Sequence, residues 1–133
     1  MPMIANRSLE RANIIAKAIR DAGHEVSSPW VLGPIENPNP MVTNVFQRDL
    51  KGSESAEILV ADVSQPSIGV GMEIMAAYKA GKRIILISKK GNPTSRMLQH
   101  MDKKETLEFE GDDEIYPALL EALKGHHFEE LKD

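Results

Sequence analysis

The sequence contains no cysteine, which excludes a structural disulfide, a thiol nucleophile and a thiolate metal site. It also lacks any apolar run of the roughly 18 residues that a membrane-spanning helix needs. Its start, MPMIANRSLE, lacks the basic and then apolar layout of a signal peptide. Positive charge is not in excess, because 16 Lys and Arg stand against 20 Asp and Glu, for a formal net charge of -4. We therefore expect a cytoplasmic protein that binds small molecules, with no membrane and no nucleic acid polymer as partner.

The composition that remains is typical of a soluble globular protein. Of the 133 residues, 41% are hydrophobic and 27% are charged. A chain of this length can bury one substantial core and is too short for two. We therefore expect residues 1–133 to form a single domain with one principal site.

Apolar spacing predicts alternating strands and helices. Two short, nearly continuous apolar runs, EILVADV and RIILIS, are typical of strands covered on both faces. A shorter strand is expected in HEVSSPW and another at residues 106–110, with a long loop at residues 31–41. Helices are expected at residues 8–22, followed by Gly23, and at residues 72–80, closed by Gly81. Further helices are expected at residues 43–50, 96–101 and 115–123. This alternation predicts an α/β fold, with one Rossmann-like parallel sheet in flavodoxin-like order and helices on both faces. Because only MPMIAN precedes the first helix, the first strand is expected to be truncated and formed by residues 1–5.

The segment ADVSQPSIGVGMEI, residues 61–74, is predicted to be a strand end, a substrate-binding loop and a helix start. Gly69 and Gly71 would let the backbone approach a ligand closely, and the free N–H groups of the following helix would favour an anion. Ser67 adds a hydroxyl. Glu73, in or near the first helical turn, would be kept ionised by the helix dipole and could act as a nucleophile.

Cleavage of a glycosidic bond requires a second carboxylate, because one group attacks the sugar while another assists the departing atom. Asp49 is the candidate, since it lies beside the apolar stripe of the helix expected at residues 43–50. Asp62, at the strand end, is better suited to orienting a hydroxyl or a base edge.

Each of these features also has a purely structural interpretation. A GxG turn is a common connection, Glu73 could be a solvated partner of the helix dipole, and Ser67 could merely cap a helix. Asp49 could be an exposed charge. Two further groups are not expected to have a function: His126 and His127 are adjacent and lack metal-ligand spacing, and the methionines Met72, Met75, Met97 and Met101 are expected to fill the core.

Residues 62–73, DVSQPSIGVGME, resemble the signature of the nucleoside 2-deoxyribosyltransferase-like superfamily, most closely the branch of 2′-deoxynucleoside 5′-phosphate N-hydrolases. The resemblance places the family's nucleophilic glutamate on Glu73 and its phosphate-contacting serine and glycine on Ser67 and Gly69. The family's second aspartate matches Asp49, in QRDL.

This resemblance implies hydrolysis of a 2′-deoxynucleoside 5′-monophosphate through a glycosyl-enzyme on Glu73, without a metal or an organic cofactor. It also implies a homodimer in which the partner supplies phosphate-pocket residues from the region of residues 96–101. Two departures stand out. The family's first strand ends in an aromatic residue whose position would fall before Met1, and Gln99 stands where relatives offer a serine across the dimer. Alternatives are therefore deoxyribosyl transfer between bases, a nucleotide-binding module without chemistry, and a purely structural domain.

Overall fold

The computed structural model of the chain describes residues 3–5, 9–26, 52, 55–92 and 94–132. Within these residues it contains strands β1 (Met3–Ala5), β2 (Ile58–Asp62), β3 (Arg83–Lys89) and β4 (Glu105–Phe109), and helices α1 (Leu9–Asp21), α3 (Ile68–Lys79), α4 (Arg96–His100) and α5 (Ile115–Lys132), with a 3-10 turn, η2 (Asp112–Glu114), before α5. No helix of this described part is long and apolar enough to cross a membrane.

The four strands form one parallel sheet in the order β1-β2-β3-β4. In its register, Ile4 of β1 lies beside Val60 of β2, which in turn lies beside Ile85 of β3. The predicted parallel α/β sheet is thus confirmed. Residues 3–5 of the segment expected to form the first strand do so, as a strand of three residues.

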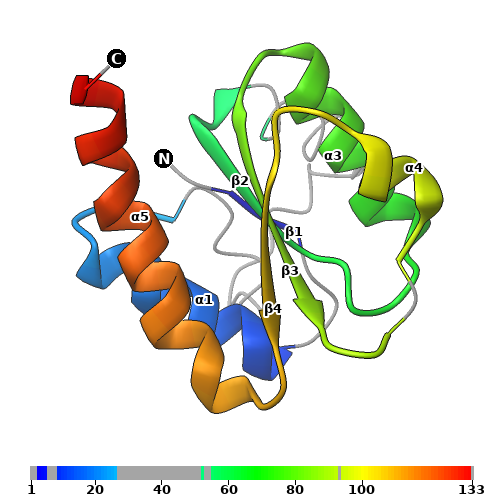
Figure 1. Cartoon of the computed structure of the whole chain (residues 1–133), viewed down its shortest axis with the longest axis horizontal. Helices are drawn as coiled ribbons and strands as arrows, with labels where there is room; N and C mark the ends of the chain where they lie inside the picture. The colour runs from blue at the N-terminus through cyan, green and yellow to red at the C-terminus, as the bar shows by residue number, and fades with distance from the viewer. Residues whose placement is uncertain (1–2, 6–8, 27–51, 53–54, 93, 133) are drawn as a thin grey trace, which may run out of the picture.

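Helices cover both faces of the sheet, as Figure 1 shows, with α1 and α5 on one side and α3 and α4 on the other. The alternation of side chains along a strand divides the core accordingly. In β2, Ile58 and Val60 pack in the layer of α1 and α5, whereas Leu59 and Ala61 pack in the layer of α3. All five residues of β2 are buried, which explains its continuous apolar sequence.

Two helices end at glycines with a positive φ, where a side chain would be strained. Gly23 has φ +93° and follows α1, and Gly81 has φ +72° and follows α3. In each case the next N–H group reaches back to a helix carbonyl, His24 to Ile19 and Lys82 to Ala77. Both helix ends were predicted from these glycines, and both are confirmed.

Other boundaries differ from those expected. Helix α3 begins at Ile68 and not at residue 72, and α5 continues to Lys132, beyond the expected end at residue 123. Pro117 is the third residue of α5, in the first turn, where its missing N–H group costs little. The strand expected in HEVSSPW lies largely outside the described residues, as do the loop at residues 31–41 and the helix expected at residues 43–50.

Candidate active site

The crossing from β2 to α3 is short and capped by Ser67. The strand ends at Asp62, residues 63–67 form the loop, and α3 begins at Ile68. Ser67 has extended backbone angles and its hydroxyl oxygen accepts a hydrogen bond of 3.3 Å from the N–H group of Val70. This cap explains why the helix begins four residues earlier than its apolar pattern indicates.

The first turn of α3 exposes backbone. Gly69 and Gly71 lie in this turn and not in the loop, so the prediction of a glycine turn before the helix is wrong. Neither has a positive φ, and a Cβ atom added to either would meet nothing within 4 Å. Among the described residues, the N–H groups of Ile68 and Gly69 have no partner. The helix therefore presents two free donors and the positive end of its dipole on an open surface.

Glu73 is the sixth residue of α3 and is half-buried. It lies in the second turn, so the prediction that it sits in or near the first turn is wrong, and the helix dipole acts on it only weakly because its influence fades beyond that turn. Glu73 follows Gly69 by four residues and therefore shares its face of the helix. The Cα atoms of Gly69 and Glu73 thus lie about 6 Å apart along one flank of the helix, at 1.5 Å per residue.

Asp62 occupies the other face of the sheet. It is 7% exposed, and one carboxylate oxygen accepts a hydrogen bond of 2.9 Å from the N–H group of Ser64 while the other lies 3.2 Å from a guanidinium nitrogen of Arg11 on α1. The same guanidinium lies 3.2 Å from Asp112. Burial favours a lower pKa for Arg11, but the hydrogen bonds to Asp62 and Asp112 outweigh it and raise that pKa. Asp62 is therefore held within the fold, on the face of the sheet that α1 covers and not on the face that α3 covers.

An apolar groove of about 910 Å³ separates α3 from α4. On α3, the groove is bordered by Gly71 and Met75. Each of these residues is two positions from Glu73 in the sequence, which corresponds to roughly 200° around the helix. Glu73 therefore lies on the opposite flank. At one end of the groove the hydroxyl of Tyr78 donates a hydrogen bond of 2.5 Å to Asp102, which lowers the pKa of Asp102 and raises that of Tyr78.

Helices α3 and α4 expose methionines that were predicted to fill the core. Met72, Met75 and Met97 are 51%, 45% and 78% exposed, and Ile68 is 86% exposed. The prediction is wrong for these three methionines, whereas Met101 packs partly against the core. Of the exposed apolar side chains, Ile68, Met75 and Met97 line the groove.

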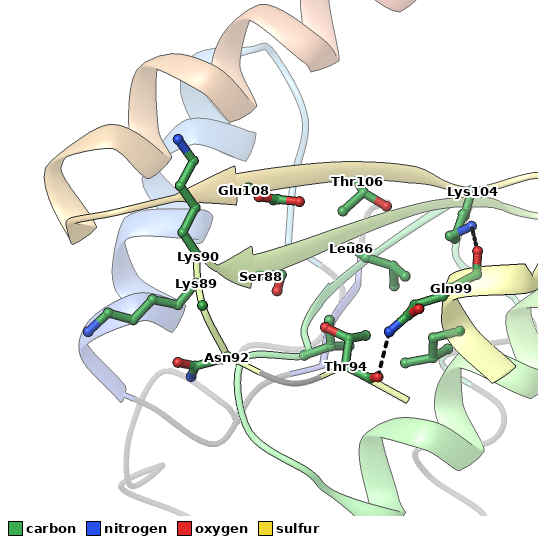
Figure 2. A pocket seen from close by; sticks show the side chains of 13 residues that line it. Leu86, Ser88, Lys89, Lys90, Asn92, Thr94, Gln99, Lys104, Thr106 and Glu108 are labelled. Atoms are coloured by element: carbon green, nitrogen blue, oxygen red, sulfur yellow. Dashed lines mark hydrogen bonds between the residues drawn. The ribbon is translucent and has the colours of Figure 1, made fainter. Parts of the chain in front are cut away.

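A second, smaller cavity of about 450 Å³ lies over β3 and β4, on the face of the sheet that α3 and α4 cover (Figure 2). Ser88 and Glu108 line it from the strands and Gln99 lines it from α4. The side-chain amide of Gln99 donates to the carbonyl of Thr94 over 2.9 Å. Because Ser67 lines the groove and not this cavity, a single copy of the chain does not bring Gln99 to Ser67.

Two predictions of the site stay open. Asp49 lies outside the described residues, so its relation to Glu73 is untested. The roles in binding or catalysis predicted for Glu73, Ser67, Gly69, Gly71, Asp62 and Gln99 also stay predictions. Sequence reasoning gave no role to Ser64 and Asn92, which fix the loop between β2 and α3. Ser64 lies within the signature of residues 62–73, whereas Asn92 belongs to no recognised motif.

Curated relatives are similar to this chain in sequence. A protein of Methanococcoides burtonii assigned by name as a 2′-deoxynucleoside 5′-phosphate N-hydrolase is 33% identical over 87 residues, which cover 63% of this chain and 71% of the relative. A protein of Thermofilum pendens with the same name is 34% identical over 65% of this chain and 63% of its own length. The match thus spans about two thirds of these relatives. No protein-family model matches the chain.

Solved structures share the fold. A CMP N-glycosidase of Clostridium botulinum superposes with a TM-score of 0.68 over 89% of this chain and 96% of that one, at 19% identity. A 2-deoxyribosyltransferase of Bacillus psychrosaccharolyticus superposes with a TM-score of 0.58 over 89% and 94%, at 25% identity. Sequence and fold agree, and the chain belongs to the 2′-deoxynucleoside 5′-phosphate N-hydrolases, a family of enzymes within the nucleoside 2-deoxyribosyltransferase-like superfamily.

Proposed function

We propose that this protein hydrolyses the N-glycosidic bond of 2′-deoxynucleoside 5′-monophosphates, releasing the free base and deoxyribose 5-phosphate. The observation that carries the proposal is the flank of α3 on which Gly69 and Glu73 lie one turn apart. The free N–H groups of Ile68 and Gly69 and the hydroxyl of Ser67 suit a phosphate. Glu73, about one helical turn away, is suited to reach C1′ at the other end of the sugar phosphate.

The reaction would proceed in two displacements. The carboxylate of Glu73 attacks C1′, the bond from C1′ to the base nitrogen breaks, and its electron pair leaves with the base. A general acid, for which Asp49 is our candidate, protonates the departing base. Water then attacks C1′ of the glycosyl-enzyme and gives up a proton, which frees Glu73 and releases the sugar phosphate. No metal or organic cofactor enters this scheme.

Specificity for the phosphate would follow from the donors at the start of α3. Hydrogen bonds to a charged group contribute about 1.5–3 kcal/mol each. The monophosphate should therefore be a better substrate than the same deoxynucleoside without its phosphate. We expect the enzyme to act in the cytoplasm, where nucleoside monophosphates are available.

We also propose that the apolar groove between α3 and α4 is the contact surface of a homodimer. Its exposed side chains include Ile68, Met75 and Met97. Soluble monomers rarely expose so many large apolar side chains in one patch. A dimer across α4 would also let Gln99 of one copy approach Ser67 of the other. Substitution Met97→Asp should give a monomer by sedimentation analysis, and a dimer that persists in this variant would contradict the proposed surface.

The experiment that tests the activity is a panel of deoxynucleoside monophosphates, matching ribonucleotides and matching deoxynucleosides, scored by release of free base. We expect release from deoxynucleoside monophosphates and its loss in Glu73→Gln. A matched control is Glu121→Gln, because Glu121 is an exposed residue of α5 on the other side of the sheet. No release from any substrate, or equal rates for Glu73→Gln and the control, would refute the proposal.

Deoxyribosyl transfer is the second candidate, favoured by the superposition on a deoxyribosyltransferase along 89% of the chain. It shares the nucleophile and differs in whether a second base or water attacks the glycosyl-enzyme. Adding a different free base and looking for a new nucleotide separates the two. Binding of monophosphates without release or exchange would instead indicate a nucleotide-binding module.

A further inference from the structure

Ser64, in the loop between β2 and α3, is 3% exposed and hydrogen-bonded at each of its polar positions. Its N–H group donates to Asp62 over 2.9 Å. Its hydroxyl oxygen accepts from the N–H group of Lys89 over 3.0 Å, and its carbonyl accepts from the side-chain amide of Asn92 over 2.7 Å. A loop residue with this many buried bonds has one well-defined position.

The bonds to Lys89 and Asn92 come from the turn that follows β3. The N–H group of Asn92 donates to the carbonyl of Lys89 over 3.1 Å, and Gly91 between them has φ +86°. Figure 2 shows the side chains of Lys89 and Lys90 pointing away from Thr94. The turn therefore holds the loop through its backbone and the amide of Asn92, and not through its lysines.

The loop is also fixed at its start. The N–H group of Val63 donates to the carbonyl of Ile87 over 2.8 Å, and Asp62 is held by Arg11, whose guanidinium also lies 5.2 Å from the ring centre of Phe109. Residues 62–64 are thus anchored to both layers of the fold. Ser67, three residues later, inherits this placement, because only Gln65 and Pro66 intervene.

We propose that Ser64 and Asn92 are positioning residues for the reaction of this site, a role that rests on the proposed function. Together they hold the loop so that the free N–H groups of Ile68 and Gly69 and the carboxylate of Glu73 keep a fixed relation to a bound substrate. Reacting groups must be held within about 0.5 Å of their productive geometry. A displacement of about 1 Å can cost a factor of about 100 in rate.

The test compares Asn92→Ala and Ser64→Ala with the wild-type protein and with Ser64→Thr, which keeps the hydroxyl. We expect kcat to fall about 10-fold to 100-fold in both alanine variants, KM to change less than about 3-fold, and the pH profile to keep its shape. Ser64→Thr should recover part of kcat. Because Asn92 is only half-buried, Asn92→Ala should fold even if Ser64→Ala does not.

A merely structural role is excluded by a control with a similar loss of stability. Ile19→Val shortens a fully buried side chain between α1 and α5, away from the loop, and typically costs about 0.5–1.5 kcal/mol. It should leave kcat unchanged at a temperature where all variants are folded. An unchanged kcat in Asn92→Ala, or an equal fall in Ile19→Val, would overturn the positioning role.

Amide hydrogen exchange tests the same inference without turnover. The hydrogen-bonded N–H groups of Val63, Ser64 and Val70 should exchange faster in Asn92→Ala than in the wild-type protein, while those of α5 should not change. If the wild-type protein released no base, the proposed function would fail, yet faster exchange would still show that Asn92 orders the loop. Unchanged exchange would overturn the inference whether or not the protein is an enzyme.

Discussion

Substitution of Gly69 by alanine should raise stability and lower activity at once. Gly69 is helical, with no positive φ, and an added Cβ atom would meet nothing within 4 Å. Alanine in place of an unstrained helical glycine typically stabilises by about 0.5–1 kcal/mol. For a domain of this size the gain corresponds to an increase in Tm of roughly 2–4 °C.

Activity should change in the opposite direction, because the new methyl group would occupy the surface where a phosphate meets the N–H group of Gly69. Loss of one charge-assisted hydrogen bond, about 1.5–3 kcal/mol, lowers kcat/KM roughly 10-fold to 100-fold. The assays are thermal unfolding and base release from a deoxynucleoside monophosphate and its deoxynucleoside. The fall in kcat/KM should be larger for the monophosphate than for the deoxynucleoside. A higher Tm with unchanged kcat/KM would refute the view that a substrate approaches the helix backbone there.

Three other substitutions test separate parts of the structure. Ser67→Ala removes the cap of α3, so the free energy of unfolding measured in urea should fall by about 0.5–1 kcal/mol. Its kcat/KM should fall more for the monophosphate than for the deoxynucleoside, and an equal fall in kcat/KM for both would contradict a phosphate contact. Arg11→Met leaves Asp62 buried without its cation and should lower the free energy of unfolding by roughly 2–3 kcal/mol. In an Asp62→Asn background the same substitution should cost less, and a double-mutant cycle measures the difference. Hydrogen bonds from Lys17 and Tyr116 lower the pKa of Asp21 below its ordinary 3.8, so the stability they confer is present above that pH and lost below it. The Tm difference between wild type and Asp21→Asn should therefore vanish between about pH 4 and pH 2, and a difference that persists at pH 2 would contradict this assignment.

The two central strands could be predicted because their burial is visible in the sequence. Residues 58–61 and 84–87 are apolar on both faces, and each run lies between helices in the structure. The helix ends at Gly23 and Gly81 were equally readable, because a left-handed backbone position strongly favours glycine. Each of these features is determined by residues that are close together in the sequence, and so each could be predicted from the sequence.

The start of α3 could not be read in this way. Gly69 and Gly71 suggest a turn by composition, yet the cap at Ser67 and the hydrophobic contacts of Val70 and Ile74 make the segment helical. The exposed methionines were misread because an apolar side chain on a helix does not show whether it faces the core or a partner.

Long-range partners were equally invisible in the sequence. Asp62 pairs with Arg11, 51 residues earlier in the chain, and Ser64 pairs with Asn92, 28 residues later. Neither pairing follows from spacing or residue type, because it depends on which strands become neighbours in the sheet. The family signature contains Asp62 and Ser64, but it does not show that their partners are Arg11 and Asn92.

The central claim is that Glu73 forms a covalent bond to the sugar. Rapid acid quenching during turnover of a deoxynucleoside monophosphate, followed by intact-protein and peptide mass spectrometry, tests it directly. We expect an adduct with the mass of a deoxyribose 5-phosphate residue on the peptide that contains Glu73, and none in Glu73→Gln. Base release at an undiminished rate in Glu73→Gln, or an adduct on another residue, would contradict it.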